Sequence, residues 1–538
     1  MDKEQKKYLR GILFRHLDGL AIAPTVSALE EGGINTFIKN NPEFTFTQIL
    51  ENFELNPGYM NVALRLLASQ GWLERNIIAD GESIDFILTI KGIKALEFSH
   101  YYKKFSKFIP ILVDMDKFLF DPNAESVQEQ FTGLIEDWRS FHSSYTDKES
   151  IGWETACHLE GLIAGPLLVA LGMSEFFRDC LNNDGIIERE LIEPPLPMLS
   201  SVLDFFMHLG WISSKEHEIS FTETGIFFMK RATAYGVTVS YLPTFKLVPA
   251  LLFGNPNILW KRTSEGLETH VNRRMNVWGS GGAHSLYFRK IDEIIKDIFN
   301  KPLEDQPVGI ADMGCGDGTL LKHLYQVVKN HTERGKYLQE LPLKIIGADF
   351  NKAARLASSI TLREAGIEHS ILHGDITGPE EYAENLKQQF GLHLDNMLNV
   401  RSFLDHNRIY SPPKKVFADR ICNSTGAFAF RGRWIPNNEL QENLVEHFSS
   451  WTQYVSKFGL LILELHTIDP KITAENLGNT LSTAYDGTHG YSDQYIMEID
   501  TVLNSAREAG LFPVMEYQAK FPDNELATIS INLFKPKH

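Results

Sequence analysis

The sequence of 538 residues has few cysteines and no excess of basic side chains. The four cysteines lie far apart and form no C-x-x-C pair, which excludes a disulfide framework and a cysteine-based zinc site. With 52 Lys and Arg against 69 Asp and Glu, the net charge of −17 argues against nucleic acid and an anionic membrane as partners. We therefore expect a soluble protein of a reducing, cytoplasmic compartment.

Long uninterrupted apolar runs are also missing. The N-terminus is charged, and the stretches 161–173 and 247–260 contain proline and are shorter than the roughly 20 residues of a membrane span. The sequence therefore predicts no signal peptide and no span. Since one domain takes roughly 100–200 residues, the length predicts about three units.

Two segments of the N-terminal half resemble each other. HLDGLAIAP begins at His16 and HLEGLIAGP at His158, and each continues into an apolar helix. A Gly-Trp pair follows in both, and then a short β-rich stretch and a T-x-x-G sequence that opens a helix. This order predicts two winged-helix-like repeats, at 1–105 and 106–240.

A winged helix suggests DNA binding, dimerisation or a lid. The helix expected over 57–69 carries one Arg and no Lys, and phosphate contacts need such side chains, so we favour a dimer or lid module. We expect the histidine and carboxylate of each HL-[DE]-G to pack in a core or interface.

The stretch 241–300 is predicted to hold connecting helices and a lid loop. Its sequence VWGSGGAH, over 277–284, is either a flexible linker or a loop that folds over a ligand, and Tyr287 just after it is a candidate cofactor contact.

A glycine-rich turn is the strongest local signal. A buried strand over 308–312 runs into Gly314, Gly316 and Gly318, and a helix follows at 319–329. The spacing G-x-G-x-G differs from the G-x-G-x-x-G of dinucleotide sites, and Asp312 precedes it by two residues. This loop resembles motif I of class I S-adenosylmethionine-dependent methyltransferases, where the acid faces the cationic amino-acid end of the cofactor.

Two more strand ends agree with that resemblance. A second strand, 344–349, ends in Asp349 and Phe350, and an acid there holds ribose hydroxyls in such folds. A third ends in Asp375 and Ile376, which the family places against the adenine. The resemblance thus implies S-adenosylmethionine as cofactor. The predicted contacts are Tyr287, Asp312, Gly314, Gly316, Gly318, Asp349, Phe350, Asp375 and Ile376.

The resemblance also implies the fold. We expect an α/β Rossmann-like methyltransferase domain with a seven-stranded sheet over 301–538, preceded by the two mainly helical repeats. Segments 512–521 and 528–534 would form its closing antiparallel pair.

Polar clusters are expected where the later strands end, the usual ligand edge of such sheets. They are RSFLDHNR at 401–408, ELH at 464–466 and THGYSDQY at 488–495. A histidine paired with an acid acts as a general base. Alternatively, two histidines and a carboxylate or amide hold a divalent metal that stabilises an enolate.

Together these motifs resemble the metal-dependent C-methyltransferase domains of polyketide synthase loading modules. That resemblance implies a malonyl- or acyl-type substrate, methylated at its α-carbon on an acyl carrier protein or as a small molecule. It places Fe²⁺ or Mn²⁺ on His466, His489 and Gln494, with Asp405 or His406 nearby. The predicted catalytic residues are His406, Asp405 and His466.

An insert at 407–438 indicates a large substrate or a shielding hairpin. Its Arg431 and Arg433 would meet a phosphopantetheine phosphate or an acidic carrier. The alternative function is O-methylation of a small metabolite with His406 as general base. A homodimer is the oligomer we consider.

Overall fold

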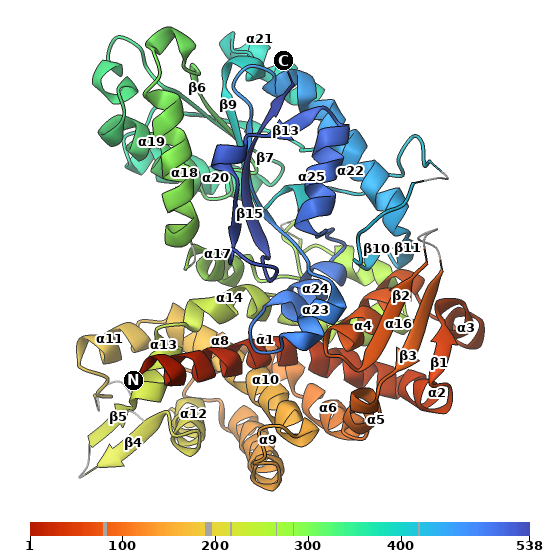
Figure 1. Ribbon diagram of the computed structural model, residues 1–538. Helices are drawn as coiled ribbons and strands as arrows, with labels where there is room; N and C mark the ends of the chain where they lie inside the picture. Colours follow the sequence, from red (N-terminus) through yellow and green to blue (C-terminus); the bar gives the residue numbers. More distant parts are fainter. Residues whose placement is uncertain are drawn as a thin grey trace.

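The computed structural model describes residues 1–537 except 79–82, 189–195, 216–217, 265, 283 and 418–419. The methyltransferase-like sheet forms one half of the molecule, and the helical repeats form the other (Figure 1). Two short helices, α23 (Pro470–Glu475) and α24 (Ser482–Gly490), lie where the halves meet.

The first repeat has a helical body and a three-stranded wing. Its elements are α1 (Lys3–Glu31), α2 (Ile34–Asn40), β1 (Glu43–Thr45), α3 (Phe46–Asn52), α4 (Pro57–Ser69), β2 (Leu73–Ile77), β3 (Ile84–Leu88), α5 (Ile90–Leu96) and α6 (Ser99–Ser106). The link to the second repeat holds α7 (Ile109–Val113), α8 (Met115–Phe118) and α9 (Glu125–Ser144).

The second repeat follows the same order with a two-stranded wing. Its elements are α10 (Ile151–Met173), α11 (Phe176–Asn182), α12 (Pro197–His208), β4 (Ile212–Lys215), β5 (Glu218–Phe221), α13 (Glu223–Met229) and α14 (Ala232–Ser240). The T-x-x-G sequence has the same task in both repeats, because Thr89 and Thr222 cap the helices by accepting from the amides of Gly92 and Gly225.

Helix α1 and helix α10 are long and apolar enough to cross a membrane by length and composition. Their most apolar windows, however, are 83% and 89% buried inside the protein. Core helices pass the same test, and these two form the centre of the helical half.

The segment expected to be a lid loop is helical. After α15 (Leu242–Lys246), α16 (Val248–Phe253) and η2 (Pro256–Trp260), helix α17 spans Arg273–Gly281. The Cβ that an alanine would add at Gly279 would lie 2.6 Å from the Cα of Gly236. The glycines of α17 therefore allow close packing on α14, and the expectation of a flexible loop was wrong here; residue 283 lies outside the described part.

The catalytic half begins with α18 (His284–Phe299) and the 3-10 turn η3 (Leu303–Asp305). Its further helical elements are α19 (Thr319–His331), η4 (Arg334–Tyr337), α20 (Lys352–Glu364), α21 (Pro379–Phe390), η5 (Leu394–Asn396), η6 (Asp405–Asn407), α22 (Asn437–Trp451), η7 (Thr452–Val455), α25 (Ile499–Glu508) and η8 (Met515–Tyr517). Its strands are β6 (Gly309–Met313), β7 (Lys344–Asp349), β8 (Ser370–His373), β9 (Leu398–Ser402), β12 (Leu460–Leu465), β13 (Leu511–Pro513), β14 (Ala519–Phe521) and β15 (Ile529–Pro536).

The strand order is β13-β15-β12-β9-β6-β7-β8, and β14 is an eighth strand that pairs with β15. Strands β6, β7, β8, β9 and β12 pair in parallel, whereas β15 runs antiparallel between β12 and β13. Helices α18, α19 and α20 pack on one face of the sheet, and α21, α22 and α25 pack on the other. The predicted methyltransferase fold and its antiparallel closure are confirmed.

The insert after β9 folds partly as a hairpin. Its strands are β10 (Phe428–Phe430) and β11 (Arg433–Ile435), and the hairpin packs against α4 of the first repeat. The Cβ of an alanine at Gly58 would lie 2.4 Å from the carbonyl oxygen of Arg433, so the contact is a close one.

Candidate functional site

The glycine loop between β6 and α19 has the backbone shape that its spacing predicts. Gly314, Gly316 and Gly318 have φ angles of 80°, 53° and 81°, a left-handed region that favours glycine. At Gly314 an added Cβ would also lie 2.8 Å from Leu404. The loop therefore needs glycine at all three positions for its backbone conformation, and at Gly314 also for the space next to Leu404.

Two carboxylates, those of Asp312 and Asp349, lie beside this loop. Asp312 is 1% exposed, and its Oδ1 has no hydrogen-bond partner among the described residues. Burial, and then the neighbouring Asp349, raise the pKa of Asp312 well above its ordinary value. Asp349 accepts from the amide of Gly316 at 3.2 Å. An orphaned acid next to a second acid fits a ligand that brings a positive charge and hydroxyl donors, as S-adenosylmethionine does.

The predicted adenine side of the site is open. Phe350 is 62% exposed, and its ring centroid lies 5.5 Å from that of His373. Asp375 accepts from the amide and hydroxyl of Thr377 through Oδ1, so part of its role is to cap the turn. Ile376 is buried, and its carbonyl accepts from the indole of Trp451. These placements leave the cofactor contacts of all three residues as predictions.

Tyr287 lies on α18 and is largely buried. Its ring contacts Phe403, at the end of β9, and Phe521, with centroids at 6.3 and 5.3 Å. Burial raises the pKa of Tyr287 to about 12, so its hydroxyl stays protonated.

The ends of β9 and β12 bring a histidine and a glutamate together. His406, on η6, donates from Nδ1 to the Oε1 of Glu464 at 2.6 Å, and both side chains are buried. The carboxylate also accepts from the backbone amides of His406 and Leu465. This bond fixes the tautomer and leaves Nε2 as the lone-pair nitrogen, which makes no hydrogen bond with the described residues.

Helix α24 adds a second histidine. The rings of His406 and His489 lie edge to face at a centroid distance of 5.0 Å. His489 donates from Nδ1 to the carbonyl of Tyr485, and burial lowers its pKa to about 3, so it is uncharged. Its Nε2 makes no hydrogen bond with any described residue.

Gln494 is held by a residue that sequence reasoning missed. Its Nε2 donates to the hydroxyl of Tyr241 at 2.9 Å and to Ser492, while its Oε1 has no hydrogen bond in the described part of the chain. Tyr241 follows α14, and its ring lies 6.2 Å from that of His489. No motif marks Tyr241, because the packing of the two halves brings it here from the end of the second repeat.

Asp405 does not face this cluster. It accepts from Arg401 at 2.6 Å and from His447 at 2.8 Å in a buried network under α22. Burial would raise the pKa of Asp405, but these two partners hold it below its ordinary value. These contacts anchor η6 through Oδ1 of Asp405, while its Oδ2 has no partner among the described residues, and the catalytic role of Asp405 stays a prediction.

His466 is also engaged elsewhere. Its Nδ1 donates to the carbonyl of Met497 at 3.0 Å, and its Nε2 accepts from the hydroxyl of Ser530 at 2.8 Å. Because both ring nitrogens are occupied, the predicted catalytic and metal-ligand roles of His466 are wrong for this arrangement. Among the described residues, no group of three or more His, Cys, Asp and Glu is placed to hold a metal.

Both arginines of the hairpin are exposed. Arg433 pairs with Glu439 at 2.7 Å. The guanidinium of Arg431 lies 5.0 Å from the ring centroid of Trp260, and its backbone amide donates to Asp493. The hairpin thus presents two positive charges at the surface, and a carboxylate pairs with that of Arg433.

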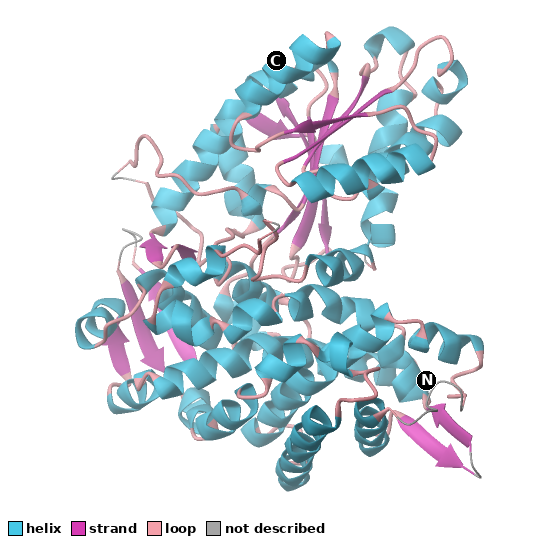
Figure 2. Ribbon diagram, turned by 180° about the vertical axis from the view of Figure 1, so that it is seen from behind, coloured by secondary structure: helices cyan, strands magenta, loops and turns pink. Residues whose placement is uncertain are grey.

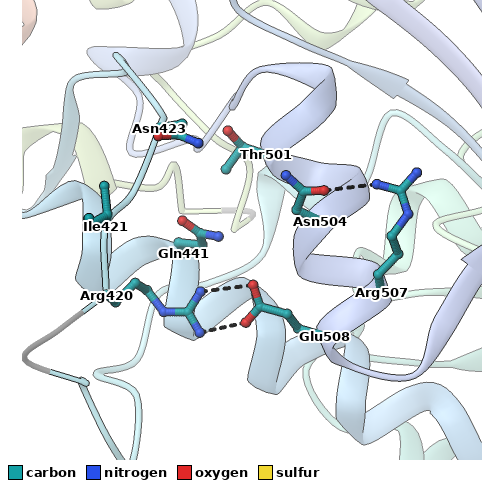
Figure 3. A pocket seen from close by; sticks show the side chains of 8 residues that line it. All are labelled: Arg420, Ile421, Asn423, Gln441, Thr501, Asn504, Arg507 and Glu508. Atoms are coloured by element: carbon teal, nitrogen blue, oxygen red, sulfur yellow. Dashed lines mark hydrogen bonds and ion pairs between the residues drawn. The ribbon is translucent and has the colours of Figure 1, made fainter.

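A surface pocket of about 280 Å³ lies away from these residues (Figure 3). Its lining includes Arg420, which forms a salt bridge with Glu508 at 2.7 Å. It also includes Arg507, which donates a hydrogen bond to the side chain of Asn504. None of its lining residues belongs to the glycine loop or to the histidine cluster.

The helix before each wing packs against other parts of the protein. Twelve of the 13 residues of α4 are buried, largely against α23, α24 and the hairpin. In the second repeat α12 packs against α9 and is half buried. The expectation that nucleic acid is not a partner stays a prediction.

Family models match three parts of the chain. Residues 268–532 match the AprA MT2-like domain, 9–75 match the AprA N-terminal domain, and 160–255 match the AprA winged helix domain. The chain belongs to this AprA-like family of S-adenosylmethionine-dependent methyltransferases. The resemblance drawn from the sequence motifs is confirmed, and the chain is an enzyme of this class.

Solved structures with a similar architecture are distant in sequence. The apo S-adenosylmethionine-dependent methyltransferase SibL is 14% identical, with 70% of this chain and 96% of that chain covered and a TM-score of 0.38. An O-methyltransferase family protein from Burkholderia thailandensis is 13% identical, with 70% and 95% covered and a TM-score of 0.37. Human N-acetylserotonin methyltransferase is 10% identical, with 73% and 100% covered and a TM-score of 0.36. No curated protein matches the chain.

Proposed function

We propose that this methyltransferase alkylates the α-carbon of a malonyl- or acyl-type substrate, with His406 as the general base. The observation that carries the proposal is the 2.6 Å bond from His406 to Glu464 at the ends of two adjacent strands. It fixes the imidazole with its basic nitrogen unpaired, as a base that must take a proton requires.

The chemistry balances with the residues at hand. Nε2 of His406 takes the α-proton, the carbanion carbon bonds to the methyl group, and the carbon–sulfur bond breaks to leave neutral S-adenosylhomocysteine. Glu464 stabilises the imidazolium formed on the way, because its carboxylate already accepts from Nδ1. The proton then passes from Nε2 to solvent.

A divalent metal is a second candidate for activating the substrate. The donor set that supports it differs from the predicted one, since His406 takes the place of His466. Nε2 of His406, Nε2 of His489 and Oε1 of Gln494 have no other hydrogen bond among the described residues. Fe²⁺ or Mn²⁺ bound by these atoms would polarise the acyl carbonyl. A metal on Nε2 would prevent His406 from acting as base, so the two schemes exclude each other.

Two questions about the methyl acceptor stay open: whether it is bound to a carrier protein, and whether its carbon or its oxygen is methylated. An acyl carrier protein is favoured by the exposed Arg431 and Arg433 of the insert, and a small-molecule acyl substrate is the alternative. The same dyad would also deprotonate a hydroxyl group, which is the O-methylation alternative. A cytoplasmic location, favoured by the four free thiols, belongs to this proposal.

Turnover of the full chain tests these assignments. Mass spectrometry would follow S-adenosylmethionine-dependent methylation of malonyl-, methylmalonyl- and acetyl-loaded carrier proteins, of the free thioesters and of a phenol. His406→Gln should lower kcat by about 10²–10⁴-fold, the usual worth of a positioned base, whereas the exposed His393→Gln serves as control. Methylation of the phenol alone would contradict the C-methylation proposal.

Metal analysis of the same proteins separates the two schemes. If His406 is the base, turnover resists chelation and His489→Gln retains most activity. If a metal activates the substrate, chelation abolishes turnover, and His406→Gln and His489→Gln both lose metal. Unchanged metal content in both variants would remove the metal scheme.

A further inference from the structure

The two N-terminal repeats pair with each other around their matching sequences. Their wings lie at opposite ends of the helical half, and the long helices α1 and α10 cross between them (Figure 2). The crossing point is the HL-[DE]-G sequence of each helix. A Cβ added at Gly19 would lie 2.2 Å from the backbone of His158, and one added at Gly161 would lie 2.2 Å from the backbone of His16. The missing side chain of each glycine thus leaves room for the backbone of the histidine in the other repeat.

The polar contacts at the crossing are exchanged between the repeats. His16, in the first repeat, contacts the hydroxyl of Tyr235 in the second at 2.8 Å. His158, in the second repeat, contacts the hydroxyl of Tyr102 in the first, also at 2.8 Å. The two tyrosines occupy equivalent places, 13 residues after the capping threonine of their repeat. Such reciprocity is what a two-fold axis imposes on a homodimer interface.

The hydrogen bond between a histidine of one repeat and a carboxylate of the other forms only once. His16 bonds Glu160 of the second repeat at 3.1 Å. The equivalent residues are His158 and Asp18, and the Nε2 of His158 and the Oδ1 of Asp18 are both buried without a partner among the described residues. Aspartate is one methylene shorter than glutamate, which accounts for the difference.

Helices α4 and α12 precede the wings of the first and second repeat, and different elements pack against them. In the first repeat Val62 of α4 lies against Gly490, and Arg65 pairs with Asp486 at 3.1 Å, so α4 holds α24 of the catalytic half. The position equivalent to Val62, counted back from the Gly-Trp pair, is Ser201 of α12.

Helix α9 covers that equivalent face of α12. Gln128 of α9 donates to Ser201 at 3.2 Å, and Trp138 packs edge to face on Phe205 at 5.2 Å. Helix α9 thus covers α12 of the second repeat, at the position where the catalytic half covers α4 of the first repeat.

We propose that the helical half is an internal dimer. The second repeat covers the surface that a second copy of the chain would otherwise cover, and α9 takes the place of a second catalytic domain. The chain is therefore a monomer with one active site. The internal partner also supports that site, because Tyr241, which directly follows the last helix of the second repeat, holds Gln494. The pairing does not depend on the identity of the methyl acceptor.

The mass of the full chain in solution tests the proposal. Light scattering over a wide range of protein concentration should give about the chain mass of 61.1 kDa, and the unfolding temperature should not depend on concentration. Twice that mass would overturn the proposal. A dimer in which the first repeat of one copy pairs with the second repeat of another would also have this doubled mass.

Matched glycine variants test the crossing itself. Gly19→Ala and Gly161→Ala should each lower the unfolding temperature by a similar amount, because the new Cβ meets rigid backbone. Gly11→Ala, on the same helix as Gly19, is the control, since its Cβ would have no contact nearer than 3.5 Å. In a helix that packs on nothing, Gly→Ala is stabilising. Crossing variants as mild as the control would therefore contradict the internal pairing.

Discussion

Asp18 makes the stability of the helical half depend on pH in a way that can be calculated. The side chain is 2% exposed, Gln70 donates to its Oδ2 at 3.3 Å, and its Oδ1 has no partner among the described residues. Burial is the main cause that raises its pKa from 3.8 to about 8, and the hydrogen bond from Gln70 only partly offsets it. The folded chain therefore keeps a proton on Asp18 at neutral pH.

The sign and size of the effect follow from that pKa. A group whose pKa is raised on folding contributes stability that is fully present below its unfolded value and is lost as pH rises to the folded value. For Asp18 the loss runs between about pH 4 and pH 8 and amounts to about 6 kcal/mol. Asn has nearly the same shape and does not titrate, so Asp18→Asn should remove this loss.

Denaturant unfolding, followed by tryptophan fluorescence from pH 5 to pH 9, measures the difference. We expect the stability of Asp18→Asn relative to the unchanged chain to increase with pH and to level off above pH 8. Other titrating groups affect both proteins alike, and so they cancel in the comparison. Parallel pH curves for the two proteins would show that Asp18 is ionised in the folded chain and would refute the reasoning.

Three further changes address the candidate site. Glu464→Gln removes a charge-assisted hydrogen bond to His406, worth about 1.5–3 kcal/mol, and should lower kcat by about 10- to 100-fold with KM for the cofactor unchanged; a loss under about threefold would argue against the dyad. Gly314→Ala should weaken S-adenosylmethionine binding in calorimetry by about tenfold or more, whereas Gly391→Ala, also at positive φ but with open space around it, should not. His466→Asn should lower the unfolding temperature without changing metal content, since its bonds are to Met497 and Ser530.

Local sequence was sufficient to predict the parts of the site that are built from consecutive residues. Asp312 and the glycines after it lie on one strand and one turn, so their spacing alone predicted the backbone shape and the ligand class. The positions of the first three parallel strands followed in the same way, because each is a short apolar run that ends at a recognisable acid or turn. Their order in the sheet came from the structure.

The acceptor cluster was predicted only in outline. The three motifs at 401–408, 464–466 and 488–495 do meet, but the sequence could not tell which of their polar side chains face one another. Asp405 points under α22 to Arg401, and His466 points to the last strand, β15. Neighbouring positions at a strand end differ in side-chain direction, and a small error in where the strand ends changes which face is reached.

The sequence by itself determined the fold, the cofactor loop and the existence of two repeats, because these depend on patterns within single segments. Only the tertiary structure decided that His406 pairs with Glu464, that Tyr241 reaches Gln494 and that the two repeats cross at their glycines. Those contacts join residues from distant segments. Their geometry is set by how helices and strands pack, and side-chain packing over long sequence separations leaves no local pattern to read.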